Sequence, residues 1–119
     1  MSENRIAKAE ALGLTTQEHY EQVLEEAAEL RIEKVHGYGE DRYYITDARV
    51  AAWMSFSDIF RKYIRLRQLT KALNQALDSG YDQEIDHAAM ALRENYKDIL
   101  NYAAQGMQDM DRIVSGGSR

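Results

Sequence analysis

Three glutamates, Glu25, Glu26 and Glu29, have types and spacing that could support chemistry. Residues three and four apart lie on one face of a helix, so these carboxylates can point into one small volume. A hard divalent cation such as Mg²⁺ needs several oxygen ligands, and the phosphates of a bound nucleotide can complete the set. The pattern predicts half of a metal site. The alternative is a solvated acidic face balanced by neighbouring basic residues.

A second polar segment, near the other end of the chain, could supply the opposing half of that site. Glu94 and Asp98 are four residues apart, and Asn101 follows Asp98 by one helical turn on the same face. An amide at Asn101 could recognise a base or a sugar, or support a metal ligand. The alternative for Asn101 is a polar residue at a helix interface, and we favour the functional interpretation.

Positive side chains are needed where phosphate charge remains. Arg61, Lys62 and Arg65 lie within about one helical turn and are the first candidates, with a solvated basic face as an equal alternative. Lys34 and Arg42 are secondary candidates for phosphate. Tyr38, in a loop flanked by glycines, is a candidate for substrate binding.

The single tryptophan, Trp53, could stack on a base. It lies on an apolar helix, however, and we expect it in the core. One Glu-x-x-His pattern, Glu84 to His87, resembles half of a di-iron site. Such a site needs the motif on two helices, and His19 and His36 provide no second copy.

The elements that must position these residues are helices. Proline is absent, and Ala, Leu, Glu, Gln and Arg are plentiful, so we predict an all-α fold. The first expected helix covers residues 2–12 and is ended by Gly13, and the second is opened by a capping box at Thr15 and Glu18 and runs to about His36. The third covers 47–78, with Asp47 as N-cap and a kink or break allowed near Ser55–Ser57. The fourth covers about 82–113.

A single domain is expected over residues 1–114, followed by a flexible tail at 115–119. Three long helices bury little apolar surface alone, and the helix over 47–78 is apolar nearly all round. We therefore predict a helical bundle that is completed by self-association as a homodimer or tetramer.

Composition excludes several classes of site. The net charge of −5 argues against broad binding of duplex nucleic acid, which lysines and arginines must neutralise. The absence of cysteine excludes disulfides and thiolate chemistry. No apolar run is long enough to span a membrane, so we expect no membrane contact and a cytoplasmic location.

The segment 24–30 resembles the Glu-Glu-x-x-Glu-Leu signature of the all-α nucleoside triphosphate pyrophosphatases, which include MazG-like enzymes and helical dUTPases. Their later Glu-x-x-Asp motif is matched at Asp98, but Asn95 stands where glutamate is expected. Glu94, one residue earlier, could substitute. A closer likeness is to the phage and bacterial nucleotide modification associated domain of the first type. It rests on the segments 31–39, 61–66 and 98–103 and covers roughly residues 15 to 108.

This resemblance implies a MazG-like helical bundle and an Mg²⁺-dependent or Mn²⁺-dependent attack of water on the α-β phosphate linkage of a nucleotide, releasing a monophosphate and pyrophosphate. Phage-encoded relatives would act in the host cytoplasm. The alternative is a non-catalytic helical interaction or adaptor protein that kept the fold, which Asn95 favours. The resemblance implies that Glu26, Glu29 and Asp98 bind the metal, Glu25 or Glu94 acts as base or further ligand, and Lys62, Arg65, Arg61, Lys34, Tyr38, Arg42, Asn101 and Asn95 contact substrate.

Overall fold

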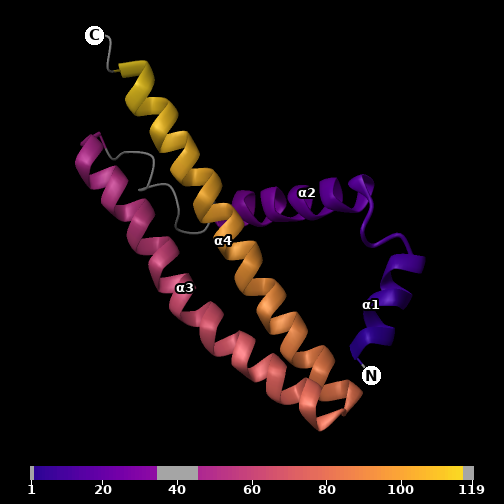
Figure 1. The fold of residues 1–119 in the computed structure, drawn as a ribbon. Helices are drawn as coiled ribbons and strands as arrows, with labels where there is room; N and C mark the ends of the chain where they lie inside the picture. Colours follow the sequence, from indigo (N-terminus) through magenta and orange to yellow (C-terminus); the bar gives the residue numbers. More distant parts are fainter. Residues whose placement is uncertain (1, 35–45, 117–119) are drawn as a thin grey trace.

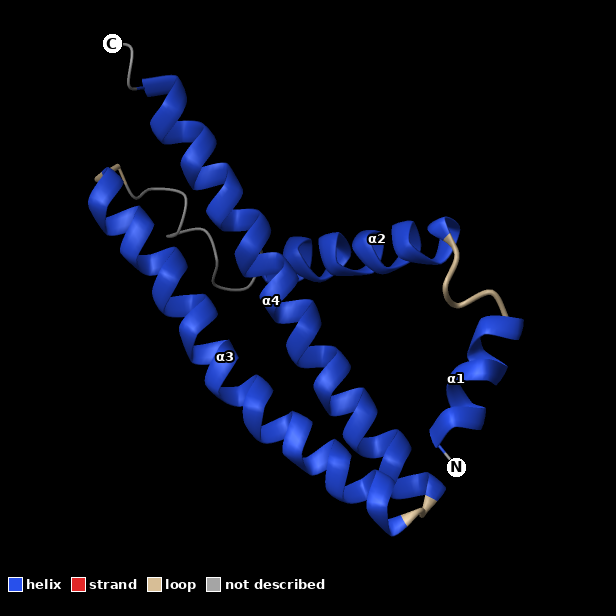
Figure 2. Ribbon diagram, in the orientation of Figure 1, coloured by secondary structure: helices blue, strands red, loops and turns tan. Residues whose placement is uncertain are grey.

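The chain folds into four helices, seen in a computed structural model that describes residues 2–34 and 46–116. They are α1 (Ser2–Ala11), α2 (Gln17–Lys34), α3 (Ala48–Ser79) and α4 (Asp82–Gly116), and the described residues contain no strand (Figures 1 and 2). The predicted all-α class is confirmed. The predicted helices all exist. α4 runs to Gly116, past its predicted end near residue 113 and into the predicted tail, and the predicted end of the second helix near His36 lies outside the described residues.

The two longest helices, α3 and α4, form an antiparallel hairpin that is the body of the molecule (Figure 1). Its turn depends on Gly80, whose φ of 75° lies in the left-handed region that favours glycine. The Gly80 N–H donates to the Ala76 carbonyl at 3.2 Å and so satisfies one carbonyl of the last turn. Asp82 then begins α4 with no room for a longer loop.

Helix α3 is continuous over 32 residues, so the break allowed near Ser55–Ser57 does not occur. Serine bends helices when its hydroxyl competes for the backbone. Here the Ser55 hydroxyl lies 2.8 Å from Asp109 Oδ2 on α4 instead. The predicted N-cap is confirmed, because the Asp47 carboxylate accepts hydrogen bonds from the backbone N–H groups of Arg49 and Val50 at 2.9 and 3.1 Å.

Helix α2 crosses α4 near its middle, and α1 returns toward the start of α4 (Figure 1). The hydroxyl that caps α2 belongs to Thr16, which accepts from His19 N–H at 3.1 Å, so the capping box predicted at Thr15 is wrong by one residue. Arg5 of α1 forms ion pairs of 2.7 Å with Asp82 and Asp86 of α4. The contact with Arg5 lowers the pKa of Asp82, chiefly through the hydrogen bond from the guanidinium.

The interior of the bundle is small and partly polar. The buried apolar residues of the described chain are Ala27, Ala51, Ala76, Ile85 and Leu92, and the buried polar ones are Asn95, Gln105 and Asp109. The small residues on α3 bring its backbone close to α4. Trp53 was predicted to lie in the core, and this is wrong: its side chain is 68% exposed.

A polar cluster joins three helices near the C-terminal half of α4. Asp109, almost fully buried, lies within hydrogen-bond distance of Ser55 Oγ and of Gln105 Nε2 at 3.3 Å. Arg31 of α2 donates to Gln105 and Gln108 at 3.2 and 2.9 Å. The cluster therefore ties α2 and α3 to α4. None of the described helices is both long and apolar enough to cross a bilayer.

Candidate metal- and phosphate-binding site

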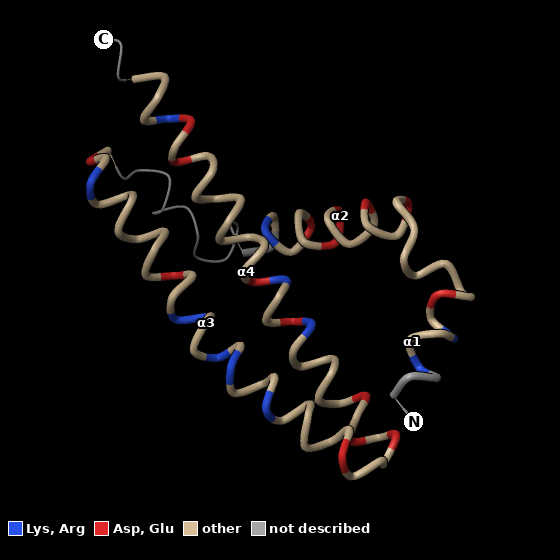
Figure 3. The backbone as a smooth tube through the Cα atoms, viewed as in Figure 1, with Lys and Arg blue, Asp and Glu red and all other residues tan. Residues whose placement is uncertain are grey.

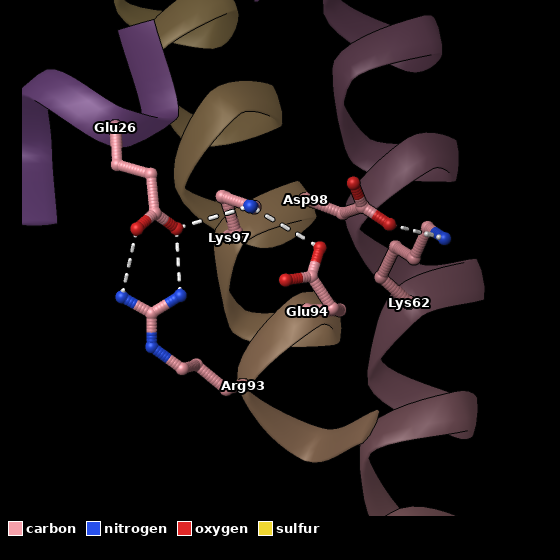
Figure 4. A network of polar contacts seen from close by, with 6 residues as sticks. All are labelled: Glu26, Lys62, Arg93, Glu94, Lys97 and Asp98. Carbon is pink, nitrogen blue, oxygen red and sulfur yellow. Dashed lines mark hydrogen bonds and ion pairs between the residues drawn. The ribbon is translucent and has the colours of Figure 1, made fainter. Parts of the chain in front are cut away.

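The carboxylate of Glu26 is the part of the predicted acidic cluster that reaches α4. It accepts two hydrogen bonds from the Arg93 guanidinium, at 2.6 and 3.1 Å, and one from Lys97 Nζ at 3.0 Å (Figure 4). The hydrogen bonds from Arg93, and after them the one from Lys97, lower the pKa of Glu26 from 4.5 to about 2. The side chain of Glu26 is therefore ionised at any ordinary pH.

Lys97 connects Glu26 to the second acidic segment. Its ammonium lies 3.2 Å from Glu94 Oε2 as well as 3.0 Å from Glu26 Oε2, and its side chain is largely buried. Bonding to Glu26, and more weakly to Glu94, raises the pKa of Lys97. One positive charge thus bridges two carboxylates from different helices, as Figure 4 shows.

On the other side of Glu94, α3 and α4 enclose a groove of about 320 Å³. Within it Lys62 Nζ of α3 forms a 2.9 Å ion pair with Asp98 Oδ2 of α4, and both side chains are mostly buried. The groove is open to solvent and carries both signs of charge. Its lining residues are Arg61, Lys62, Arg65, Leu69, Ala91, Glu94, Asn95 and Asp98.

The two asparagines have different surroundings. Asn95 is 4% exposed, and its Nδ2 donates to the Lys62 backbone carbonyl at 3.1 Å. The structure thus shows Asn95 as a clamp between α4 and α3, beneath Lys62, in addition to its place at the groove wall. Asn101 Nδ2, one turn beyond Asp98, is buried and has no hydrogen-bond partner among the described residues. A buried donor of this kind costs free energy until an acceptor reaches it.

The predicted basic residues differ in their partners. Arg61 donates to Tyr102 Oη at 3.2 Å, stacks over that ring with Cζ 5.9 Å from its centroid, and lies 3.5 Å from Asp58. Arg65 is exposed at the groove edge. Figure 3 shows the basic run of α3 beside the stretch of α4 that carries both acidic and basic residues. The structure therefore brings the predicted basic residues of α3 to the same groove as Asp98 and Glu94.

The acidic cluster itself is divided. Glu25 and Glu29 are exposed on α2, away from the contacts that hold Glu26. Within residues 2–34 and 46–116, no three acidic or histidine side chains converge as a metal-binding group. Three predicted substrate residues, Lys34, Tyr38 and Arg42, concern side chains outside the described part of the chain.

Sequence reasoning missed the cationic partners of Glu26. Arg93 and Lys97 are four residues apart and so share the face of α4 that meets α2. That spacing, together with the position of Glu26 beside the apolar edge of its helix, was a usable signal. Tyr102, the partner of Arg61, was also missed. Its signal was only its place in the segment 98–103.

Neither the known family models, nor the curated proteins, nor the solved structures contain a match to this chain. Its resemblance to the all-α pyrophosphatases stays a prediction, carried by the motifs alone.

Proposed function

We propose that the chain is a Mg²⁺-dependent nucleoside triphosphate pyrophosphohydrolase, or a close relative that acts on modified nucleotides. The observation that carries the proposal is the gathering of Glu94 and Asp98 of α4 with Lys62 of α3 in one open groove. A nucleotide triphosphate with its metal requires both signs of charge within a few ångströms.

The donor set fits Mg²⁺ in chemical type. Glu26, Glu94 and Asp98 offer hard carboxylate oxygens from two helices, and a cation already lies between the first two as the Lys97 ammonium. By the resemblance, Glu26, Glu29 and Asp98 would hold the metal, with Glu25 as a further carboxylate. This requires that Lys97 and Lys62 release their partners and that α2 turn Glu29 and Glu25 from their exposed positions toward α4. When bound, the metal would neutralise phosphate charge and polarise the phosphorus-oxygen bond.

The remaining residues act on the substrate. Lys62, once released from Asp98, binds phosphate oxygens together with Arg65 and Arg61. Glu94, which is half exposed, accepts a proton from the attacking water. The water oxygen bonds to the α-phosphorus while the bond to the bridging oxygen breaks, giving a monophosphate and pyrophosphate. The unsatisfied Asn101 amide donates to an acceptor of the sugar or base.

A panel of canonical and modified nucleoside triphosphates, each with Mg²⁺ or Mn²⁺, tests this proposal through release of pyrophosphate and monophosphate. We expect turnover of at least one nucleotide. Asp98→Asn and Glu29→Gln should each lower its rate by at least about 100-fold. Glu18→Gln, an exposed glutamate of α2 outside the groove, is the matched control. Full activity in Asp98→Asn would show that the site lies elsewhere.

A second candidate function is a non-catalytic helical interaction protein. It is favoured by the pairing of Glu26 with Arg93 and Lys97 and of Asp98 with Lys62, since balanced pairs hold helices together without any ligand. The two functions differ in one measurement. An adaptor gives no turnover with any nucleotide and no change in melting temperature with Mg²⁺ or Mn²⁺.

A further inference from the structure

The chain exposes more surface than a folded monomer of its mass. Its accessible area is 9187 Å², whereas a 13.7 kDa globular monomer exposes about 6,600 Å². Its radius of gyration is 17.7 Å, against about 13.5 Å for a compact domain of this length. The excess area, roughly 2,600 Å² for one chain, is larger than the roughly 800 Å² that each partner buries in a standard interface.

Six of the 19 exposed large apolar residues in the described part of the chain follow one line on α3, which we name the aromatic stripe. Its members recur at spacings of three and four residues and so share one face of the helix. Each is between 47% and 68% exposed. The aromatic stripe consists of Val50, Trp53, Phe56, Phe60, Tyr63 and Ile64.

The aromatic stripe is ordered and lies opposite the groove. Trp53 packs edge-on against Phe56, with centroids 5.8 Å apart, and Phe56 stacks on Phe60 at 5.9 Å. On the other side of α3, Ser55 and Lys62 contact α4. A partner can therefore cover the stripe without closing the groove.

The stripe carries no charge over four turns. The charged residues between Val50 and Ile64, namely Asp58, Arg61 and Lys62, lie toward α4 and the groove, where Lys62 pairs with Asp98 and Arg61 contacts Tyr102. Arg49 and Arg67 flank the two ends of the stripe. A charged partner would find nothing complementary on the stripe. An equally uncharged aromatic surface matches it, and a second copy of the chain offers that surface by symmetry.

The exposed area of the aromatic stripe is large enough for an interface with a second copy of the chain. With about 150–250 Å² for each aromatic side chain, the exposed fractions give the aromatic stripe roughly 600 Å². Two stripes face to face would bury about 1,200 Å², the lower end of the range for specific interfaces. We propose that the aromatic stripe is the contact of a two-fold homodimer, in which α3 packs against α3 of a second copy with Phe56 and Phe60 at its centre.

Sedimentation of the full chain between about 1 and 200 µM tests the interface. The wild type should reach twice 13.7 kDa. Phe60→Glu should weaken dimerisation by at least about 30-fold, because it buries a charge at the centre of the contact. Met90→Glu, the same kind of change at an exposed apolar residue of α4, should dimerise like the wild type. Circular dichroism checks that each variant keeps its helices.

Two further readouts address the stripe directly. Trp53 is the only tryptophan, so its emission should shift to shorter wavelength as the wild type is concentrated, and should not shift in Phe60→Glu. The chain has no cysteine, so Ser57→Cys, exposed within the stripe, introduces one thiol that should cross-link two copies on mild oxidation. Met90→Cys should not cross-link.

A wild type that stays monomeric at 200 µM overturns the proposal, and the stripe would then serve a different apolar partner. A wild-type dimer that Phe60→Glu leaves intact overturns it too, because the interface must use another face. Neither result bears on nucleotide turnover, which depends on the groove on the opposite side of α3.

Discussion

Replacing Asn95 with aspartate distinguishes a structural clamp from a missing catalytic carboxylate. Asparagine and aspartate have nearly the same shape, so the substitution leaves packing unchanged and alters only charge and hydrogen bonding. In the native protein Asn95 Nδ2 donates to the Lys62 carbonyl at 3.1 Å, inside the interface of α3 and α4. The ionised side chain of the Asn95→Asp variant would place a carboxylate oxygen against that carbonyl oxygen.

The loss of stability in Asn95→Asp follows from these contacts. A lost hydrogen bond removes about 1 kcal/mol of stability, and an unpaired buried charge adds at least about 2 kcal/mol more. We therefore expect Asn95→Asp to lower the free energy of unfolding by about 3 kcal/mol at pH 7. That loss is a large share of the roughly 5–15 kcal/mol that stabilises an ordinary domain.

The stability deficit of Asn95→Asp should depend on pH. Burial beside a carbonyl raises the pKa of the new carboxyl in the folded state above its unfolded value of about 3.9. The folded state then binds the proton more tightly than the unfolded chain. The deficit should be complete at pH values above the raised folded pKa and should shrink as pH falls toward 3.9, where the protonated acid can donate to the carbonyl as asparagine does.

Urea unfolding followed by circular dichroism at pH 7 and at pH 4 measures this deficit. Asn74→Asp is the matched control, since Asn74 is exposed on α3. It should change stability by no more than about 0.5 kcal/mol at either pH. Equal stability of the two variants at pH 7, or a deficit that does not change with pH, would refute the assignment of Asn95 as a buried donor.

Two further variants test other parts of the fold. Arg93 and Lys97 lower the pKa of Glu26 to about 2, so the wild type should melt at a higher temperature than Glu26→Gln. This difference in melting temperature should be full above pH 4.5 and disappear as pH falls toward 2. The control Glu18→Gln should show no such trend. Gly80→Ala should lower the free energy of unfolding in urea by about 1 kcal/mol, since φ is 75° and no atom lies within 4 Å of the added Cβ. Gly116→Ala, equally open but without the positive φ, should have no measurable effect; equal stability of the two glycine variants would contradict the strain argument.

Local signals predicted the helices well. Asp47 before an apolar run, Gly80 after one, and the absence of proline all act within a few residues, so the order and approximate ends of α1 to α4 follow from the sequence. The same local view failed for Ser55, because the partner of its hydroxyl, Asp109, is 54 residues away. It failed for Trp53 because an apolar helix does not show which of its faces meets a neighbour.

The candidate site was predictable in its residue types and less so in its pairings. Helical spacing placed Glu94 and Asp98 on one face, and the structure shows both at the groove. Spacing placed Arg93 and Lys97 on one face of α4, but it could not by itself show that Glu26 would meet that face, since the crossing of α2 over α4 depends on packing between distant residues such as Ala27. Which charged residues pair across helices therefore depends on contacts between residues that are far apart in the sequence.

The crossing of α2 over α4 has a consequence for motion. α2 is held to α4 by the short buried patch at Ala27 and by the polar ties of Glu26 and Arg31, whereas α3 and α4 contact each other along most of their length. In native-state hydrogen exchange such an element opens before the global transition. The helix bearing Glu26 can thus move away from α4 while the hairpin of α3 and α4 stays folded. Glu26 would then leave the candidate site without any unfolding of the groove.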